Sequence, residues 1–464
     1  MHSELCIIGA GPGGYRAAEY AAKQGLKVTV FEGADVGGTC LNVGCIPTKT
    51  YVHSATFEEA RERMAQVVPQ LRAGVEGILS HPNITLVREN ASFVNHGDCP
   101  SCAEPASHRG TVPVIRAGGE TYTADNIIIA TGSETKWLPI KGKDDPRVVD
   151  STGLLQLDTL PKRLAIIGAG VIGMEFACVF HRFGSEVTVI EYLKECLPAL
   201  DSDIAKRLRK YLEKQGITFK MKTAVEDIAD IDADVVLMAT GRKPRTEGLN
   251  LEAVGITLAP NGAIPVDDDF RCVCDHTMAT NVNIFAIGDV NGRQMLAHAA
   301  EAQAIYVVNK IVNRKSVNRK WLDIMPAAIF TTPEAACVGL TEDQFKEQGI
   351  PYVCKKSFWR ANGKALAMNA TEGMLKLFFS PPESGGVPEG RGGLRSAEGR
   401  LLPSGRKNNN NGLILGCHAY GAHAADIVQE VSVLMCKHTT LQELSDMVHI
   451  HPTLSEILKT AAET

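Results

Sequence analysis

The chain lacks a strong charge bias and a long apolar run, and each absence excludes a class of protein. Its 464 residues carry 48 Lys and Arg against 53 Asp and Glu, for a net charge of −5. So small an imbalance gives no broad electrostatic attraction to nucleic acid or to an anionic membrane. No uninterrupted apolar stretch approaches the roughly 20 residues that a membrane-spanning helix requires. We therefore expect no nucleic-acid partner and no membrane span.

The N-terminal segment and the cysteine usage favour the cytoplasm. The sequence MHSELCIIGAGPGG has neither a positive n-region nor a small-residue cleavage site, so a secretory signal is not expected. Thirteen cysteines in a cytosolic chain favour free thiols, a catalytic pair or a metal site over a disulfide scaffold. The 44% apolar and 22% charged residues are typical of a globular protein, and the length suggests about three domains.

Two segments of the chain share one pattern. Residues 5–32 (LCIIGAGPGGYRAAEYAAKQGLKVTVFE) match residues 164–191 (LAIIGAGVIGMEFACVFHRFGSEVTVIE) at a constant offset of 159 residues, the spacing of Gly9 and Gly168. Each copy predicts an apolar strand, a G-x-G-x-x-G turn, an amphipathic helix and a second strand that ends in glutamate. This context turns a weak glycine pattern into the fingerprint of a dinucleotide-binding fold. We therefore expect two bound dinucleotides.

Each glycine of the fingerprint has a physical reason. The first permits the tight turn, the second lets the backbone approach a pyrophosphate, and the third lets helix and strand pack closely. The helix N-terminus then offers free N–H groups to the anion. Glu32 and Glu191 each follow the last glycine by 18 residues, where a carboxylate accepts hydrogen bonds from a ribose diol, and this favours NAD over NADP. Lys194 lies only three residues after Glu191, so NADP stays open as an alternative cofactor.

Three further apolar runs are predicted to be buried strands that end near a cofactor. NIIIATG (126–132) and VVLMATG (235–241) each end in a small-residue turn, as expected at the carboxyl ends of parallel strands. NIFAIGDV (283–290) places Asp289 just past a glycine, where it is either a cofactor ligand or a simple turn residue.

A pair of closely spaced cysteines follows the first copy. Cys40 and Cys45 lie in GGTCLNVGCIPTK, among glycines at 37, 38 and 44, and Pro47 could open a helix whose N-terminus favours a thiolate. Zinc would instead favour C-x-x-C with a second pair nearby, so a redox-active disulfide is the better hypothesis. Its place beside the first nucleotide fold assigns the flavin to that fold and the nicotinamide to the second, with electrons passing between NAD(P)H, flavin and disulfide.

The C-terminal segment HIHPTLSE offers the general base that thiol–disulfide exchange needs, because this exchange proceeds through thiolates. His449 and His451 are the histidines of this segment. Pro452 is suited to a helix start, so Glu456 would return about one turn later and hold His451 in one tautomer. A dithiol elsewhere in the chain favours this reading over a structural histidine.

Together these motifs resemble the pyridine nucleotide-disulfide oxidoreductases over nearly all of the chain, most closely the branch that oxidises dihydrolipoamide. GGTCLNVGCIPTK and HIHPTLSE are similar to the two signatures of that branch. The resemblance implies that Cys40 meets the lipoyl dithiol and that Cys45 is the charge-transfer thiol beside the flavin. It also implies that His451, held by Glu456, is the base for the disulfide of the other subunit in a homodimer.

The resemblance extends to Lys49 and to the cofactor contacts, and it implies no metal site. From the residues alone, Lys49 could neutralise reduced flavin, pair with Glu175 or be a solvated surface lysine; the resemblance implies the pairing, near the flavin ring. The implied FAD-binding residues are Gly9, Gly11, Gly14, Glu32, Gly38, Thr39, Lys49, Thr131, Gly132, Ser133, Asp289, Met295, Leu296, Ala297 and His298. The implied NAD-binding residues are Gly168, Gly170, Gly173, Glu175, Glu191 and Gly241.

The implied fold is α/β, with two Rossmann-like dinucleotide-binding domains and a C-terminal α+β dimerisation domain. We expect the FAD-binding domain at 1–147, the NAD-binding domain at 148–262, a central segment completing the FAD-binding domain at 263–323, and the dimerisation domain at 324–464. The implied activity is oxidation of protein-bound dihydrolipoamide to lipoamide with NAD as acceptor. The implied partner is a lipoyl-bearing protein of a 2-oxoacid dehydrogenase complex or of the glycine cleavage system.

Two segments depart from the family pattern, and two other functions stay open. Residues 380–412 predict a flexible inserted loop. HGDCPSCAEPASH interrupts a predicted β-meander and allows either a plain loop or a small zinc knuckle of His96, Cys99, Cys102 and His108.

An NADPH-dependent reductase of a small disulfide such as glutathione would differ in cofactor preference. A flavin-bearing interaction protein without turnover would fail a simple activity assay.

Overall fold

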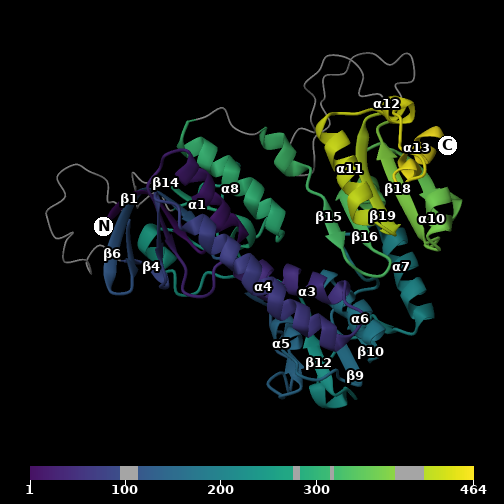
Figure 1. Cartoon of the computed structure of the whole chain (residues 1–464), viewed down its shortest axis with the longest axis horizontal. Coiled ribbons are helices and arrows are strands. Elements are labelled where there is room, and N and C mark those ends of the chain that lie inside the picture. The colour runs from purple at the N-terminus through teal and green to yellow at the C-terminus, as the bar shows by residue number, and fades with distance from the viewer. Residues whose placement is uncertain (95–112, 275–282, 314–317, 382–411) are drawn as a thin grey trace. The chain divides into compact units, whose positions relative to one another are not determined.

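The computed structural model describes residues 1–94, 113–274, 283–313, 318–381 and 412–464 (Figure 1). Within these ranges the chain forms two compact units. Unit 1 comprises residues 1–138, 149–158 and 240–322, and unit 2 comprises residues 139–148, 159–239 and 323–464. The exact domain boundaries expected from the sequence stay predictions.

Unit 1 is built on a largely parallel sheet, as its G-x-G-x-x-G copy predicts. Parallel pairing joins β3 (Ile84–Val87), β2 (Val28–Phe31), β1 (His2–Ile8) and β6 (Glu120–Ile129) in that order, with β14 (Asn283–Ala286) also beside β6. β5 (Val114–Ala117) and β4 (Ala91–Val94) continue from β6 in antiparallel. The predicted β-meander is therefore confirmed.

Both faces of this sheet are covered, which explains why its strands are continuous apolar runs. In β1, Leu5 and Ile7 belong to a core shared with α1 (Pro12–Lys23) and α8 (Ala297–Ile311), whereas Cys6 and Ile8 belong to a second core. α1 packs against α8 (Figure 1) and against α4 (Phe57–Leu79). The other elements of unit 1 are α2 (Gly38–Val43), α3 (Cys45–Val52), β7 (Ser133–Thr135), α5 (Ser151–Leu155), β13 (Arg242–Pro244), η4 (Leu251–Val254), η5 (Gly288–Asn291) and, at its end, η6 (Arg319–Asp323).

Unit 2 contains the second copy as a five-stranded sheet. Its order is β11 (Thr218–Met221), β10 (Glu186–Glu191), β9 (Arg163–Ile167), β12 (Val235–Met238) and β8 (Val148–Val149), and the pairs from β11 to β12 are parallel. α6 (Val171–Phe183) follows β9, α7 (Ser202–Gln215) follows β10, and η3 (Ile228–Asp230) precedes β12. Gly184 ends α6 at φ +107°, a left-handed conformation that glycine adopts without steric cost.

An antiparallel sheet forms the C-terminal part of unit 2. Its order is β15 (Ala327–Ile329), β16 (Ala335–Gly339), β19 (Ile414–Gly421), β18 (Gly373–Phe379) and β17 (Val353–Phe358). α11 (Ala424–Cys436) and α13 (Glu456–Glu463) bury apolar residues against it. Trp359 is fully buried, and a Cβ atom on Gly373 or Gly421 would lie 2.7 or 2.3 Å from its indole ring, so only glycine fits there. The shorter helices are α9 (Glu342–Glu347), η7 (Trp359–Ala361), α10 (Gly363–Ala367) and α12 (Leu441–Asp446).

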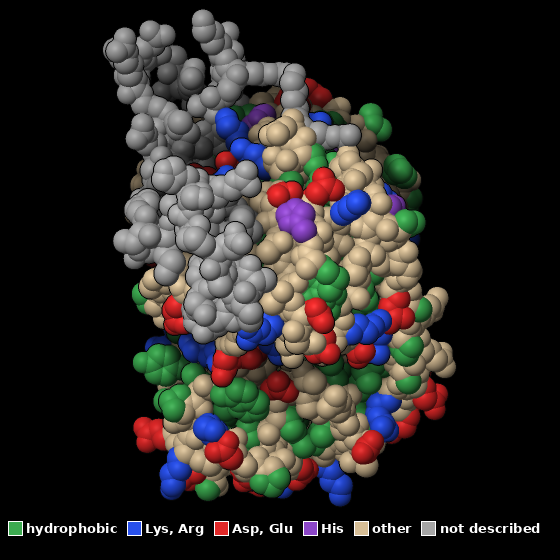
Figure 2. Space-filling view, turned by 90° about the vertical axis from the view of Figure 1, so that its left-hand side faces the viewer, with side chains coloured by type: hydrophobic (Ala, Val, Ile, Leu, Met, Phe, Trp, Pro, Cys, Tyr) green, Lys and Arg blue, Asp and Glu red, His purple; other side chains and the backbone are tan. Residues whose placement is uncertain are grey.

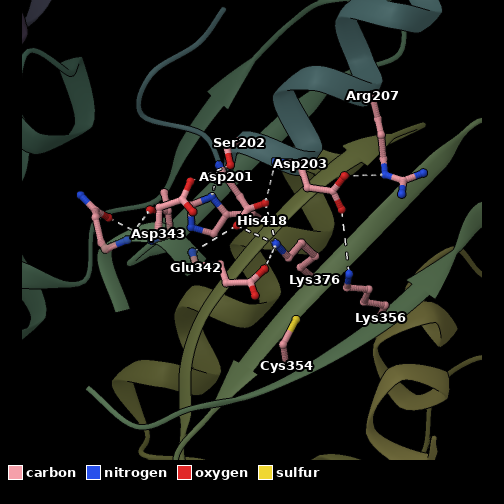
Figure 3. A network of polar contacts seen from close by, with 12 residues as sticks. Asp201, Ser202, Asp203, Arg207, Glu342, Asp343, Cys354, Lys356, Lys376 and His418 are labelled. Atoms are coloured by element: carbon pink, nitrogen blue, oxygen red, sulfur yellow. Dashed lines mark hydrogen bonds and ion pairs between the residues drawn. The ribbon is translucent and has the colours of Figure 1, made fainter. Parts of the chain in front are cut away.

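A buried ion network joins the segment before α7 to this antiparallel sheet (Figure 3). The side chain of Lys376, on β18, is only 1% exposed, and its Nζ lies 2.7 and 2.8 Å from the carboxylate oxygens of Asp201 and 2.5 Å from Oε2 of Glu342. The Asp201 backbone N–H donates to Nδ1 of His418, whose Nε2 donates to the Leu340 carbonyl. Burial lowers the pKa of His418 to about 4, so this ring is neutral at pH 7.

The structure confirms the expected fold class of two Rossmann-like sheets and a C-terminal α+β part. Across the described ranges, no helix is both long and apolar enough to cross a bilayer. On the face shown in Figure 2, acidic and basic side chains are interspersed rather than gathered by sign.

Candidate active site

The two glycine turns have the same geometry. Gly9 and Gly168 adopt φ +101° and +104°, a region that favours glycine. A Cβ atom on Gly14 would lie 1.9 Å from the Gly9 carbonyl oxygen, and one on Gly173 would lie 2.1 Å from that of Gly168. The third glycine of each fingerprint is therefore required by the packing of helix against turn.

The first acidic residue is held by the backbone of its own turn. The Ala10 N–H donates to Oε2 of Glu32 at 2.8 Å, and the Ala34 N–H donates to Oε1 at 3.0 Å. Each carboxylate oxygen keeps a further lone pair, which can accept from a ribose hydroxyl. The carboxylate is thus fixed before any ligand binds.

The second copy repeats this arrangement 159 positions later. The Ala169 N–H donates to Oε2 of Glu191 at 2.6 Å, and the Leu193 N–H donates to Oε1 at 2.7 Å. Helices α1 and α6 begin after Gly11 and Gly170 without a side-chain cap, so their first N–H groups are available to a pyrophosphate. A Cβ atom on Gly170 would meet nothing within 4 Å. Both turns therefore fit a dinucleotide.

The thiol pair lies where two short helices meet. Cys40 is on α2, and Cys45 is the first residue of α3, where a helix N-terminus favours a thiolate. Both are thiols in the structure, which is the reduced form of the pair. A hydrogen bond with Cys45, together with burial, raises the pKa of Cys40, while the positive charge of Lys49 opposes this rise. Cys45 is exposed.

Gly38 brings the thiol helix to the first dinucleotide turn. It adopts φ +61°, and a Cβ atom there would lie 2.7 Å from the Cα of Gly11. Because α2 begins at Gly38, Thr39 and Cys40 follow directly from this close approach. This contact supports the assignment of the flavin to the first fold.

Strand ends of unit 1 converge on Asp289. Ser133, which follows Thr131 and Gly132 after β6, donates from Oγ to Oδ2 of Asp289 at 2.5 Å. Arg242 donates from Nε to the Ser133 hydroxyl at 2.7 Å and from a terminal nitrogen to the Ser133 carbonyl at 2.7 Å. Sequence reasoning missed Arg242; the only signal for it is its place directly after the strand-ending glycine in ATGRKP.

The start of α8 carries the segment from Met295 to His298. Leu296 is the residue before the helix, and Ala297 is its first residue, again without a side-chain cap. Because α8 packs against α1, this uncapped N-terminus belongs to the same part of unit 1 as the first glycine turn. Direct contacts of these residues with a flavin stay predictions.

The histidine and glutamate of HIHPTLSE meet in unit 2. Nδ1 of His451 lies 2.9 Å from Oε1 of Glu456, and the Thr453 N–H donates to Oε2 of the same carboxylate at 2.8 Å. The Thr453 N–H, and next His451, lower the pKa of Glu456. The expected helix start at Pro452 is wrong: α13 begins at Glu456, after Ser455.

The surroundings of His451 are exposed and apolar. The side chain of His451 is 78% exposed, and its neighbours Val448 and Ile450 are 95% and 79% exposed. The side chain of His449 is only 7% exposed instead, and its Nε2 lies 3.3 Å from Oε1 of Glu430. Exposed apolar residues of this kind mark an interaction surface.

Other expected site residues belong to different units or lie outside the described ranges. Lys49 belongs to α3 of unit 1 and Glu175 to α6 of unit 2, so their pairing stays a prediction. Glu175 is buried and accepts the Phe330 N–H at 2.9 Å. Gly241 precedes β13 in unit 1. The zinc-knuckle residues His96, Cys99, Cys102 and His108, and most of the insertion near 380–412, lie outside the described residues; among those described, no three His, Cys, Asp or Glu side chains are grouped to hold a metal ion.

Comparison with known proteins identifies the class. Residues 3–304 match the pyridine nucleotide-disulphide oxidoreductase family, and residues 325–387 and 407–462 match its dimerisation domain. The chain belongs to this family. It is accordingly a flavoprotein oxidoreductase with FAD and NAD as cofactors, and it forms a homodimer.

Several relatives cover the whole chain. The mitochondrial dihydrolipoyl dehydrogenase of Pisum sativum is 34% identical over 99% of this chain and 91% of its own length, and the dihydrolipoyl dehydrogenase of Geobacillus stearothermophilus is 34% identical over 100% and 96%. A leghemoglobin reductase of Glycine max is also 34% identical, over 99% and 87%. Among solved structures, the HOCl-induced flavoprotein disulfide reductase RclA from Escherichia coli is 30% identical, with a TM-score of 0.83 over 99% of each chain.

Proposed function

We propose that the protein is a dihydrolipoyl dehydrogenase, which oxidises protein-bound dihydrolipoamide to lipoamide with NAD as acceptor. One observation carries this proposal: the thiols of Cys40, on α2, and Cys45, at the start of α3, are hydrogen-bonded, and the contact of Gly38 with Gly11 holds α2 against the first dinucleotide turn. The names of the full-length relatives support the same activity.

The thiol pair exchanges electrons with the lipoyl group. One lipoyl thiolate attacks the sulfur of Cys40 in the Cys40–Cys45 disulfide, and Cys45 leaves as a thiolate. The second lipoyl thiolate then attacks the mixed disulfide, which closes the lipoyl ring and releases Cys40. Two electrons have moved to the protein dithiol, and bound FAD supplies the chemistry that passes them to NAD as a hydride. The protein's task is to hold the dithiol against the first fold.

His451 removes the protons that this exchange releases. Its Nδ1–H donates to Glu456, so Nε2 is the nitrogen that accepts a proton. We place His451 at the disulfide of the other subunit, which would also cover the exposed Val448 and Ile450.

Glu191 favours NAD as the nicotinamide cofactor. Both of its oxygens are fixed by backbone N–H groups at the end of β10, so a ribose diol meets a prepared acceptor and a 2′-phosphate meets a negative charge. The lipoyl partner would belong to a 2-oxoacid dehydrogenase complex or to the glycine cleavage system, and the cytoplasm stays our predicted location.

The test is steady-state reduction of NAD and of NADP by dihydrolipoamide, on protein checked for bound flavin. Rapid turnover with NAD is expected. A flavin-loaded protein that does not oxidise dihydrolipoamide with either nucleotide would overturn the proposal.

A second candidate is a reductase of another disulfide. The likeness to RclA over 99% of both chains favours it. The same preparation, assayed with NADPH or NADH and oxidised glutathione, separates the two functions: this candidate requires faster turnover there than with dihydrolipoamide.

A further inference from the structure

Arg242, Ser133 and Asp289 form a hydrogen-bonded chain in unit 1. Arg242 is on β13 and Ser133 on β7, and these strands pair in antiparallel so that Arg242 faces Thr135 and Pro244 faces Ser133. From this diagonal position the guanidinium donates to both oxygens of Ser133 at 2.7 Å. The Ser133 hydroxyl in turn donates to Asp289 at 2.5 Å.

The direction of each hydrogen bond among Arg242, Ser133 and Asp289 is fixed. A guanidinium has only donors, so the Ser133 hydroxyl must accept from Arg242 and use its single hydrogen for Asp289. Asp289 is therefore the acceptor of this bond, and its ionised form accepts more strongly than its protonated form. A lysine at 242 would present a point charge without the planar fork that reaches two oxygens of one residue.

Charge also links Arg242 to Asp289. Burial raises the pKa of Asp289, and the Ser133 hydroxyl and the charge of Arg242 oppose that rise. Burial lowers the pKa of Arg242, whereas the negative charges of Asp289 and Asp150 oppose the fall. Asp150 is itself held, because it accepts from the Thr135 hydroxyl at 2.9 Å and from the Gly153 N–H at 2.9 Å.

We propose that Arg242 is a positioning residue that, through Ser133, keeps the Asp289 carboxylate ionised and aimed to accept hydrogen bonds from the sugar hydroxyls of FAD. This inference rests on the flavin assignment within the proposed function. It adds to that assignment a residue on a different strand that governs how firmly the flavin is held.

The experiment measures flavin affinity rather than turnover. The dissociation constant of FAD is determined by flavin fluorescence on the homodimer, at pH 6 and pH 8, for the wild type and for Arg242→Gln, Arg242→Lys and Ser133→Ala. The matched control is Lys243→Met, which removes the cation next to Arg242 on β13. The Nζ of Lys243 pairs with Glu134 at 2.8 Å at the surface.

We expect Arg242→Gln to weaken FAD binding at least about tenfold, since hydrogen bonds to charged groups contribute about 1.5–3 kcal/mol. The loss should be larger at pH 6 than at pH 8, because Asp289 is protonated more readily without the guanidinium. Arg242→Lys should restore binding only in part, Ser133→Ala should weaken it in the same direction, and Lys243→Met should leave it unchanged.

A double variant tests whether Arg242 acts through Asp289. In Arg242→Gln/Asp289→Asn the losses should not add, because both changes remove one interaction. Additive losses, or wild-type affinity and pH dependence in Arg242→Gln, would overturn the proposal. If Arg242→Gln does not fold, Ser133→Ala combined with Asp289→Asn carries the same test. A wild type that binds FAD but does not oxidise dihydrolipoamide would refute the proposed function and leave this one standing.

Discussion

Nδ1 of His451 lies 2.9 Å from Oε1 of Glu456, while the imidazole itself is 78% exposed. An exposed histidine that is nevertheless locked to a carboxylate has one ring nitrogen committed and the other free for proton transfer. The pair is thus prepared for chemistry on a group outside its own domain.

Replacing His451 by Gln should lower kcat with dihydrolipoamide by about 10²–10⁴-fold, the usual contribution of a general base. Flavin content and thermal stability should stay at wild-type values because the side chain is exposed. His423→Asn is the matched control, since His423 is an exposed histidine of the same domain at φ +57°, which Asn tolerates. An unchanged rate in the Gln variant would remove His451 from the mechanism.

Replacing Cys45 by Ser should abolish the long-wavelength absorption of a thiolate against the flavin in the two-electron-reduced protein. Cys45 begins α3 and is the thiol that we place beside the flavin. Cys40→Ser should keep this absorption, because it leaves the Cys45 thiolate in place. If the absorption survives in Cys45→Ser and is lost in Cys40→Ser, the two thiols have the opposite roles.

Replacing Lys376 by Met should destabilise the protein by about 3–5 kcal/mol, since it leaves the buried Asp201 carboxylate without its counter-ion. The control is Lys356→Met, whose half-exposed ammonium lies 3.9 Å from Asp203 (Figure 3) and should contribute about 0–1 kcal/mol. Chemical unfolding of both variants provides the comparison. Equal losses of unfolding free energy in the two variants would contradict the prediction that the buried Lys376–Asp201 pair contributes more than an exposed one.

The same network predicts a pH dependence of stability. Burial raises the pKa of Glu342, but hydrogen bonds from Lys376, Lys346 and Tyr352 outweigh it and bring the pKa to about 2, from an ordinary 4.5. A depressed carboxyl pKa contributes stability that is present above the ordinary value and lost as the pH falls through the depressed one. The urea midpoint of the wild type should therefore exceed that of Glu342→Gln at pH 6, and the gap should narrow between pH 4.5 and pH 2. A constant gap would exclude the ionised carboxylate as its cause.

Local spacing predicted most of the candidate site, and long-range contacts hid the rest. The two glycine turns, Cys40 with Cys45, and His451 with Glu456 are each set within a few dozen residues, so their spacing carries the geometry. Arg242 and Ser133 are 109 residues apart, and Lys376 and Asp201 are 175 apart. The pairing of β13 with β7 brings the first two together, and the contact of the segment before α7 with β18 brings the second two together.

The helix start at Pro452 was wrong for a local reason. Proline is common in the first turn of a helix, but α13 begins only at Glu456, whose carboxylate accepts the Thr453 N–H. A threonine followed three residues later by glutamate is a sequence signal for a helix that begins after the threonine, but the Thr453 hydroxyl donates to the Ile450 carbonyl instead, so no capping box forms there.

The identical bracing of Glu32 and Glu191 has a consequence for cofactor choice. Because the Ala10 and Ala169 N–H groups hold the two acids alike, the turns by themselves cannot distinguish a flavin dinucleotide from a nicotinamide dinucleotide. The choice between the two dinucleotides must therefore depend on the groups that lie beside the second glycine of each turn, Gly11 or Gly170. In the first copy Gly38, at the start of α2, lies close to the second glycine, whereas in the second copy the space beside the second glycine is open. The first dinucleotide site is therefore covered by the helix that carries Cys40, and the second admits a ligand that must bind and leave in each catalytic cycle.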